Sequence, residues 1–73
     1  MDEHARLLAF EEMLGGVIRE REDAIARMAA LKAQGKEKTV TYRQLLATKL
    51  ELGNLLTRYR RYGLVERETP PDA

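Results

Sequence analysis

Two stretches of apolar residues at helical spacing, separated by a short charged connector, most constrain what this chain can fold into. The first stretch recurs at threes and fours from Leu7 to Leu31, and the second recurs in the same way from Tyr42 to Tyr62. Such spacing places each set along one side of an α-helix. The sequence therefore predicts an all-α fold, an antiparallel two-helix hairpin.

The predicted domain covers residues 1–65 and is followed by a flexible polar tail over residues 66–73. Within the domain we expect a first helix over about residues 2–33, a connector over 34–40 and a second helix over about 41–62. Gly35 and Gly63 stand where each helix is expected to stop, because glycine readily adopts the left-handed conformation found just after a last helical turn.

The expected helix starts carry their own signals. Asp2 stands at the positive end of the first helix dipole, where a carboxylate is favourable. Thr41 is followed three residues later by Gln44, which is the spacing of a capping box, and this pattern favours Thr41 as the cap of the second helix. Thr39 is the competing cap.

A glycine pair, Gly15-Gly16, interrupts the first predicted helix. Each glycine costs up to about 1 kcal/mol relative to alanine inside a helix, so the pair predicts a tolerated kink or a break. The alternative hypothesis is that the missing side chains make space for the ring of Tyr59 or Tyr62, which an antiparallel arrangement brings near the pair.

The apolar surface of the two helices exceeds what one hairpin can cover. At about 1.5 Å per residue the first helix is roughly ten residues longer than its partner, and Leu7, Leu8 and Phe10 fall in the overhang. The second apolar stripe sweeps roughly 200° of its helix, more than one neighbouring helix covers. We therefore expect a homodimer, with two hairpins forming a four-helix bundle.

The residues expected at the interface between copies share an apolar side chain on these stripes. They are Leu7, Phe10, Leu14, Val17, Leu46, Leu52, Leu56 and Tyr59. A different protein partner is expected to use the overhang and the apolar edge formed by Leu46 and Leu50.

Two charged residues, Arg21 and Lys49, lie inside the apolar stripes. Their stems can pack while their charges reach water, which is the common behaviour of long basic side chains. The alternative is a buried polar contact that fixes helix register or partner choice.

The composition argues against several function classes. Acidic and basic residues nearly cancel, with a formal net charge of +1, and the chain has no cysteine and one histidine. No phosphate loop, metal-ligand spacing or catalytic motif is present, and the carboxylates mostly alternate with arginines at helical spacing. We expect no enzyme activity, no cofactor and no metal. An acidic start and the lack of an apolar run of about 20 residues predict no signal peptide and no membrane span, hence a cytoplasmic protein.

A cluster of basic residues near the end of the second predicted helix suggests a second function, the binding of nucleic acid. Arg58, Arg60 and Arg61 are interleaved with two tyrosines, and residues 41–63 carry five basic residues against one acidic residue. Such a helix face could contact phosphates, with the aromatic rings available for stacking on unpaired bases. A solvated helix end explains the same residues, because arginines favour the negative end of the helix dipole.

The segment over residues 55–67 resembles the end of a winged-helix recognition helix entering its wing, where a basic helix is followed by Gly63-Leu64-Val65 and charged residues. That fold requires a helix and a tight turn before the recognition helix, and Gly53-Asn54 is the place for such a turn. In overall architecture the predicted hairpin resembles small dimeric hairpin regulators of bacteria. The sequence favours a non-catalytic interaction or adaptor protein, with a nucleic-acid-binding regulator as the alternative.

Overall fold

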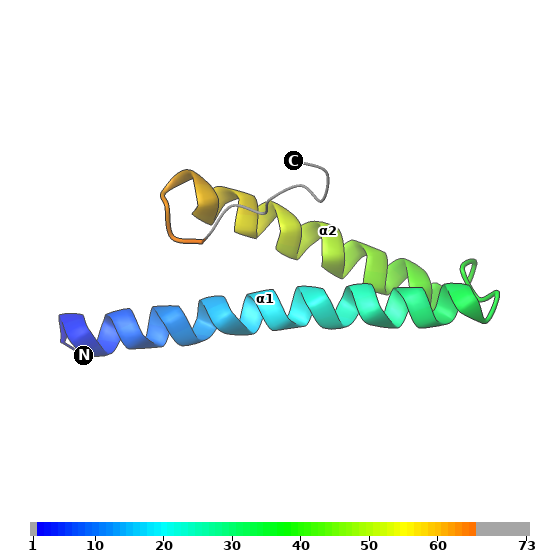
Figure 1. The fold of residues 1–73 in the computed structure, drawn as a ribbon, viewed down its shortest axis with the longest axis horizontal. Coiled ribbons are helices and arrows are strands. Elements are labelled where there is room, and N and C mark those ends of the chain that lie inside the picture. The colour runs from blue at the N-terminus through cyan, green and yellow to red at the C-terminus, as the bar shows by residue number, and fades with distance from the viewer. Residues whose placement is uncertain (1, 66–73) are drawn as a thin grey trace.

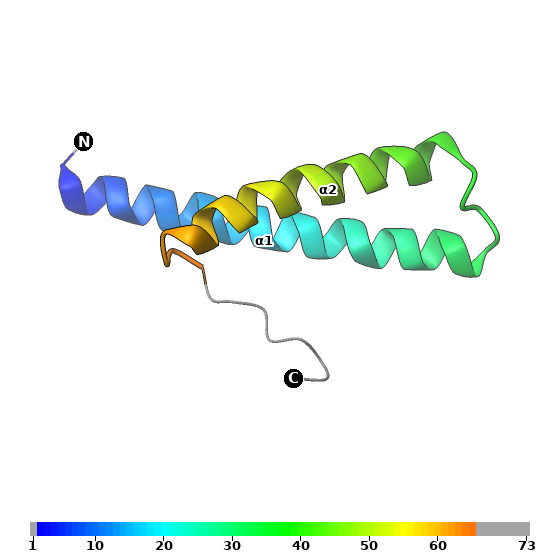
Figure 2. The same ribbon diagram turned by 90° about the horizontal axis from the view of Figure 1, so that it is seen from above.

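The fold is an antiparallel pair of helices joined by a short connector, as a computed structural model describes it for residues 2–65. Helix α1 spans Glu3–Ala33 and helix α2 spans Val40–Arg61. Figure 1 shows α2 folding back along α1, and Figure 2 shows the two helices crossing at a shallow angle. The predicted all-α hairpin is confirmed. Neither helix contains a stretch long and apolar enough to traverse a bilayer within residues 2–65.

Both helices end with the same hydrogen-bonded motif. After α1, Gly35 has a φ of 72°, the Lys36 N–H donates to the Leu31 carbonyl at 2.8 Å, and the Gly35 N–H donates to Lys32 at 3.0 Å. After α2, Gly63 has a φ of 73°, and the bonds from Leu64 to Tyr59 and from Gly63 to Arg60 are both 3.1 Å. This is the pattern of a left-handed glycine stop. Both predicted stops are confirmed.

The start of α1 agrees with the sequence-based expectation, whereas the start of α2 differs from it. Asp2 caps α1, with its Oδ1 accepting the Ala5 N–H at 2.7 Å. The preference for Thr41 as the cap of α2 is wrong, because Thr39 accepts the Tyr42 N–H at 3.2 Å. The Thr39 hydroxyl also donates to the Lys36 carbonyl at 2.8 Å. This second bond ties the cap to the connector, an advantage that Thr41, two residues further along the chain, does not have.

The core consists of two apolar clusters along the contact between the helices. The cluster near the open end contains Leu14, Val17 and Leu56. The cluster near the connector contains Ala24, Met28 and Leu45.

A half-buried polar layer, Arg21 and Lys49, lies between these clusters along the sequence of each helix. The Arg21 Nε lies 3.5 Å from where a Cβ on Gly53 would stand, so Arg21 reaches across to α2. This distance is an ordinary van der Waals contact, so Arg21 lies directly against this part of α2.

The glycines do not interrupt either helix. Helix α1 runs unbroken through Gly15-Gly16, so neither a break nor a space for a tyrosine ring is found there. A Cβ on Gly15 would meet the Arg19 guanidinium at 3.2 Å, and one on Gly16 would meet nothing within 4 Å. Helix α2 likewise continues through Gly53, which removes the turn that a winged helix requires. The wing itself falls partly on residues outside the described range.

The overhang of α1 is shorter than the sequence predicts. Phe10 packs edge-on against Tyr59, with ring centroids 5.6 Å apart and an interplanar angle of 77°. Leu7 and Leu8 lie beyond this contact and are each 53% exposed. Tyr62, which the sequence places in the second apolar stripe, is the residue after the last turn of α2 and is 76% exposed.

Candidate interaction surface

The two core clusters determine which residues line each edge of the hairpin. Core positions recur alternately every three and four residues on both helices, so their immediate neighbours lie at the margins of the helix contact. In an antiparallel pair, residues that follow Val17, Ala24 and Leu45 lie on one edge. Residues that directly precede the remaining core positions, as Met13 precedes Leu14 and Leu55 precedes Leu56, lie on the other edge.

The first edge is almost entirely apolar at its centre. It contains Ile18, Ile25 and Leu46, each directly after a core residue, and Leu50 one turn beyond Leu46. We call these four residues the leucine edge. Ile18 is half-buried, whereas Ile25, Leu46 and Leu50 are 38%, 37% and 57% exposed. Single exposed leucines are ordinary on a protein surface, but a contiguous apolar row is characteristic of an interaction surface.

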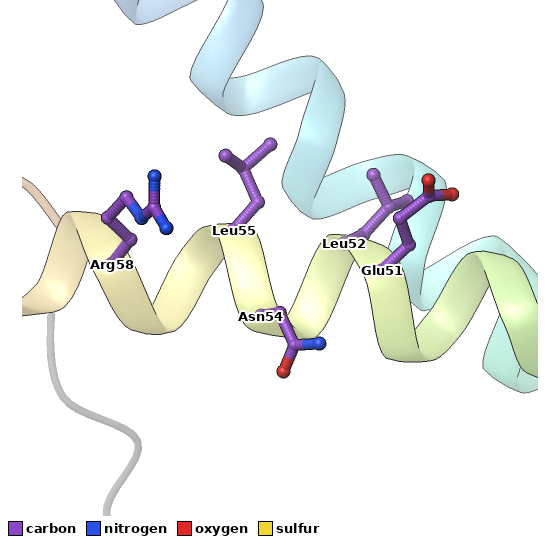
Figure 3. A pocket seen from close by; sticks show the side chains of 5 residues that line it. All are labelled: Glu51, Leu52, Asn54, Leu55 and Arg58. Atoms are coloured by element: carbon purple, nitrogen blue, oxygen red, sulfur yellow. The ribbon is translucent and has the colours of Figure 1, made fainter.

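The second edge mixes apolar and polar residues and is not smooth. We call it the hollowed edge, and it comprises Met13, Arg27, Thr41, Thr48 and Leu55. One open hollow of about 410 Å³ on this side is lined by Glu51, Leu52, Asn54, Leu55 and Arg58. Figure 3 shows its two leucines directed toward α1 and Asn54 directed away from it.

A second hollow on this edge, of about 210 Å³, is lined by Arg27, Ala30, Leu31, Thr41 and Leu45. Both hollows are therefore flanked by charged or hydroxyl side chains. Apolar surface lies between these groups in both hollows, so this edge combines polar and apolar contacts.

The structure distributes the predicted interface residues over three environments. Leu14, Val17 and Leu56 are buried between α1 and α2 of one chain. Phe10, Leu52 and Tyr59 are half-buried against the same cluster, so one chain covers them in part. Leu7 and Leu46 remain exposed.

Sequence reasoning missed Ile18 and Ile25 as members of the leucine edge. Each stands one residue after a core position; Ile18 packs in part against the core cluster near the open end, whereas Ile25 is exposed beside the cluster near the connector. Ile25 and Leu46 come to the same edge only in the antiparallel register, so the sequence of one helix carries no signal for them.

The basic end of α2 is not one open arginine surface. Arg58 and Arg61 are exposed and, with Asn54 and Thr57, line a hollow of about 330 Å³. Arg60 is half-buried, and its Nε is a buried atom. The Thr57 hydroxyl donates to the Gly53 carbonyl at 3.0 Å. Of the three arginines expected to contact nucleic acid, the structure brings two together.

The described part of the chain presents no assembled chemical centre of the metal-binding kind. Across residues 2–65, no group of three or more histidine, cysteine or acidic side chains could hold a metal ion. One exposed ion pair, Asp23 with Arg27 at 3.9 Å, lies one turn apart on α1. An exposed pair of this kind contributes little to stability. Comparison of the chain with protein-family models, with curated proteins and with solved structures gave no match.

Proposed function

We propose that this protein is a non-catalytic helical interaction protein that self-associates through the leucine edge. Two copies would bury this edge against each other and form a four-helix bundle. The observation that carries the proposal is the row of Ile25, Leu46 and Leu50, which remains between 37% and 57% exposed after the hairpin has formed. Burying such side chains is favourable by roughly 25 cal/mol for each Å² removed from water.

The hairpin offers a face of suitable size. Helix α2 has 22 residues, so the overlapping part of the hairpin is about 33 Å long. Two packed helices are roughly 20 Å wide, which gives a face of roughly 650 Å² before the overhang of α1 is added. A typical stable interface buries about 800 Å² per partner. The whole face together with the overhang approaches this value, and the leucine edge with Leu7 and Leu8 is the apolar part of it.

The test is the mass in solution, measured by sedimentation or light scattering at low micromolar concentration. We expect the natural chain to have the mass of two copies and the variant Leu46→Glu with Leu50→Glu to have the mass of one. The matched control is Ala47→Glu, which adds one carboxylate next to Leu46 but at an exposed position away from the edge. It should keep the mass of two copies.

Two results would overturn the proposal. One is a natural chain with the mass of one copy that keeps its helical circular dichroism. The other is an unchanged mass for the Leu46→Glu, Leu50→Glu variant. If this variant loses its helicity as well, dilution of the natural chain provides the second measurement, because dissociation and helix loss should then occur together.

A second candidate function is binding of nucleic acid by the basic end of α2, and the hollow beside Arg58 and Arg61 favours it. Arg58, Arg61 and Asn54 line one hollow, and Tyr62, which follows Arg61 in the chain, is 76% exposed. Guanidinium groups suit phosphate contacts, and an exposed ring can stack on a base.

This candidate predicts binding to a single-stranded oligonucleotide that weakens steeply as salt increases. Arg58→Glu with Arg61→Glu should abolish the binding and leave the helical content unchanged. The control, Lys36→Glu with Lys38→Glu, changes the net charge by the same amount at the far end of the hairpin. Equal loss in both variants, or no binding at low salt, would contradict the candidate.

A further inference from the structure

The two ends of the hairpin differ in net charge. The loop end, residues 24–50, has six basic residues against one acidic residue, a net charge of +5. The open end, residues 2–23 and 51–65, has eight acidic residues against six basic residues, a net charge of −2. The chain folds back on itself, so these groups collect at opposite ends of one elongated body (Figure 1). The balanced overall charge therefore conceals a charge separation along the hairpin.

The leucine edge lies near the middle of this body. Ile18 is the central residue of α1, and Ile25 is two turns closer to the connector. On α2, Leu50 lies between Leu45, which packs with Ala24 and Met28, and Gly53, which lies against Arg21. A surface centred at mid-length overlaps with its own copy when that copy is reversed end for end. This is the requirement for an antiparallel symmetric interface in which both copies use the same surface.

From these two features we infer that a second copy docks antiparallel on the leucine edge, with the loop end of each chain beside the open end of the other. A parallel arrangement would bring together two loop ends of charge +5. The antiparallel one instead places each loop end beside an end of opposite sign. Complementary charge of this kind sets orientation and excludes wrong arrangements more than it adds affinity. The inference rests on the proposed self-association.

Distances between spin labels on the two copies distinguish these orientations. The chain has no cysteine, so Lys36→Cys introduces a single labelling site in the connector. In the antiparallel dimer the two labels should be about 45 Å apart, the length of a 31-residue helix. In a parallel dimer they should be less than about 25 Å apart, because packed helices have axes only about 8–10 Å apart.

A label at Glu3→Cys provides the independent check, since it marks the open end. This single variant should also give a long distance, whereas a mixture of Lys36→Cys and Glu3→Cys chains should give a short one. Short distances for either single variant in a protein with the mass of two copies would overturn the orientation and leave self-association intact. A mass of one copy would overturn the proposed function itself.

Discussion

The two edges of this hairpin are built from the same two helices and border the same core, yet they differ in composition. The leucine edge presents Ile25, Leu46 and Leu50 in an apolar row, whereas the hollowed edge alternates Met13 and Leu55 with threonines and an arginine. The hairpin does not need either edge to be apolar, because its core clusters lie between the helices. The difference therefore identifies a surface whose composition the fold of one chain does not explain.

The largest difference between the two edges should appear when an acidic side chain replaces one apolar residue on each. The two residues chosen have nearly equal exposure. Ile25 on the leucine edge is 38% exposed and Met13 on the hollowed edge is 42% exposed, and both belong to α1. Ile25→Glu should weaken self-association by roughly 10- to 100-fold, because it places a carboxylate in a surface that excludes water. Met13→Glu should leave the dissociation constant within about twofold of the natural value. Sedimentation over a concentration series measures both, and equal effects would contradict the assignment of the interface to one edge.

A smaller effect should follow from reversing charges at the margins of the leucine edge. Lys32 and Arg43 lie at the loop end and Glu11 at the open end, all with exposed side chains. In an antiparallel dimer, Lys32→Glu with Arg43→Glu should weaken association by about tenfold at low salt, and mixing with Glu11→Lys chains should restore it. In a parallel dimer the variant alone would instead associate about as well as the natural chain, because like charges would face each other at the two loop ends in both proteins. Native mass spectrometry of the mixtures reads out which pairs form.

The smallest expected effect is a change in stability from a substitution in the glycine pair. It tests a position of α1 that lies on neither edge. A Cβ on Gly16 meets nothing within 4 Å, so Gly16→Ala should raise the free energy of unfolding by up to about 1 kcal/mol. For a chain of this size that corresponds to roughly 4–8 °C in the melting temperature. Gly16 lies away from the leucine edge, so the dissociation constant should not change. A lower melting temperature would show that this glycine has a packing role that the hairpin does not reveal.

Much of the fold was predictable because its signals are local. The periodicity of the apolar residues predicted both helices, and the left-handed preference of Gly35 and Gly63 predicted where they stop. The cap at Thr39 was not chosen, because its advantage comes from a hydrogen bond back to Lys36, which depends on how the connector folds. A capping-box pattern in the sequence carries no information about that geometry.

The candidate surface was less predictable than the fold. An apolar stripe shows which residues can be buried but does not divide them between the intrachain core and a second contact. Leu14 and Leu56 were expected to face a second copy, yet they fill the contact between α1 and α2. Ile25 was overlooked because its role depends on sharing an edge with Leu46 in the folded hairpin. Both differences depend on long-range register, which no single helix encodes.

The polar layer of Arg21 and Lys49 also has a consequence for the order of folding. It separates a cluster that closes a short loop, with Met28 and Leu45 17 residues apart, from one in which Leu14 and Leu56 are 42 residues apart. Closing the longer loop first costs roughly 1 kcal/mol more chain entropy than closing the shorter one. We therefore expect the contacts near the connector to form first. The contacts beyond the charged layer, toward the open end, should form later. Amide hydrogens near the free ends would then exchange with solvent ahead of those beside Met28.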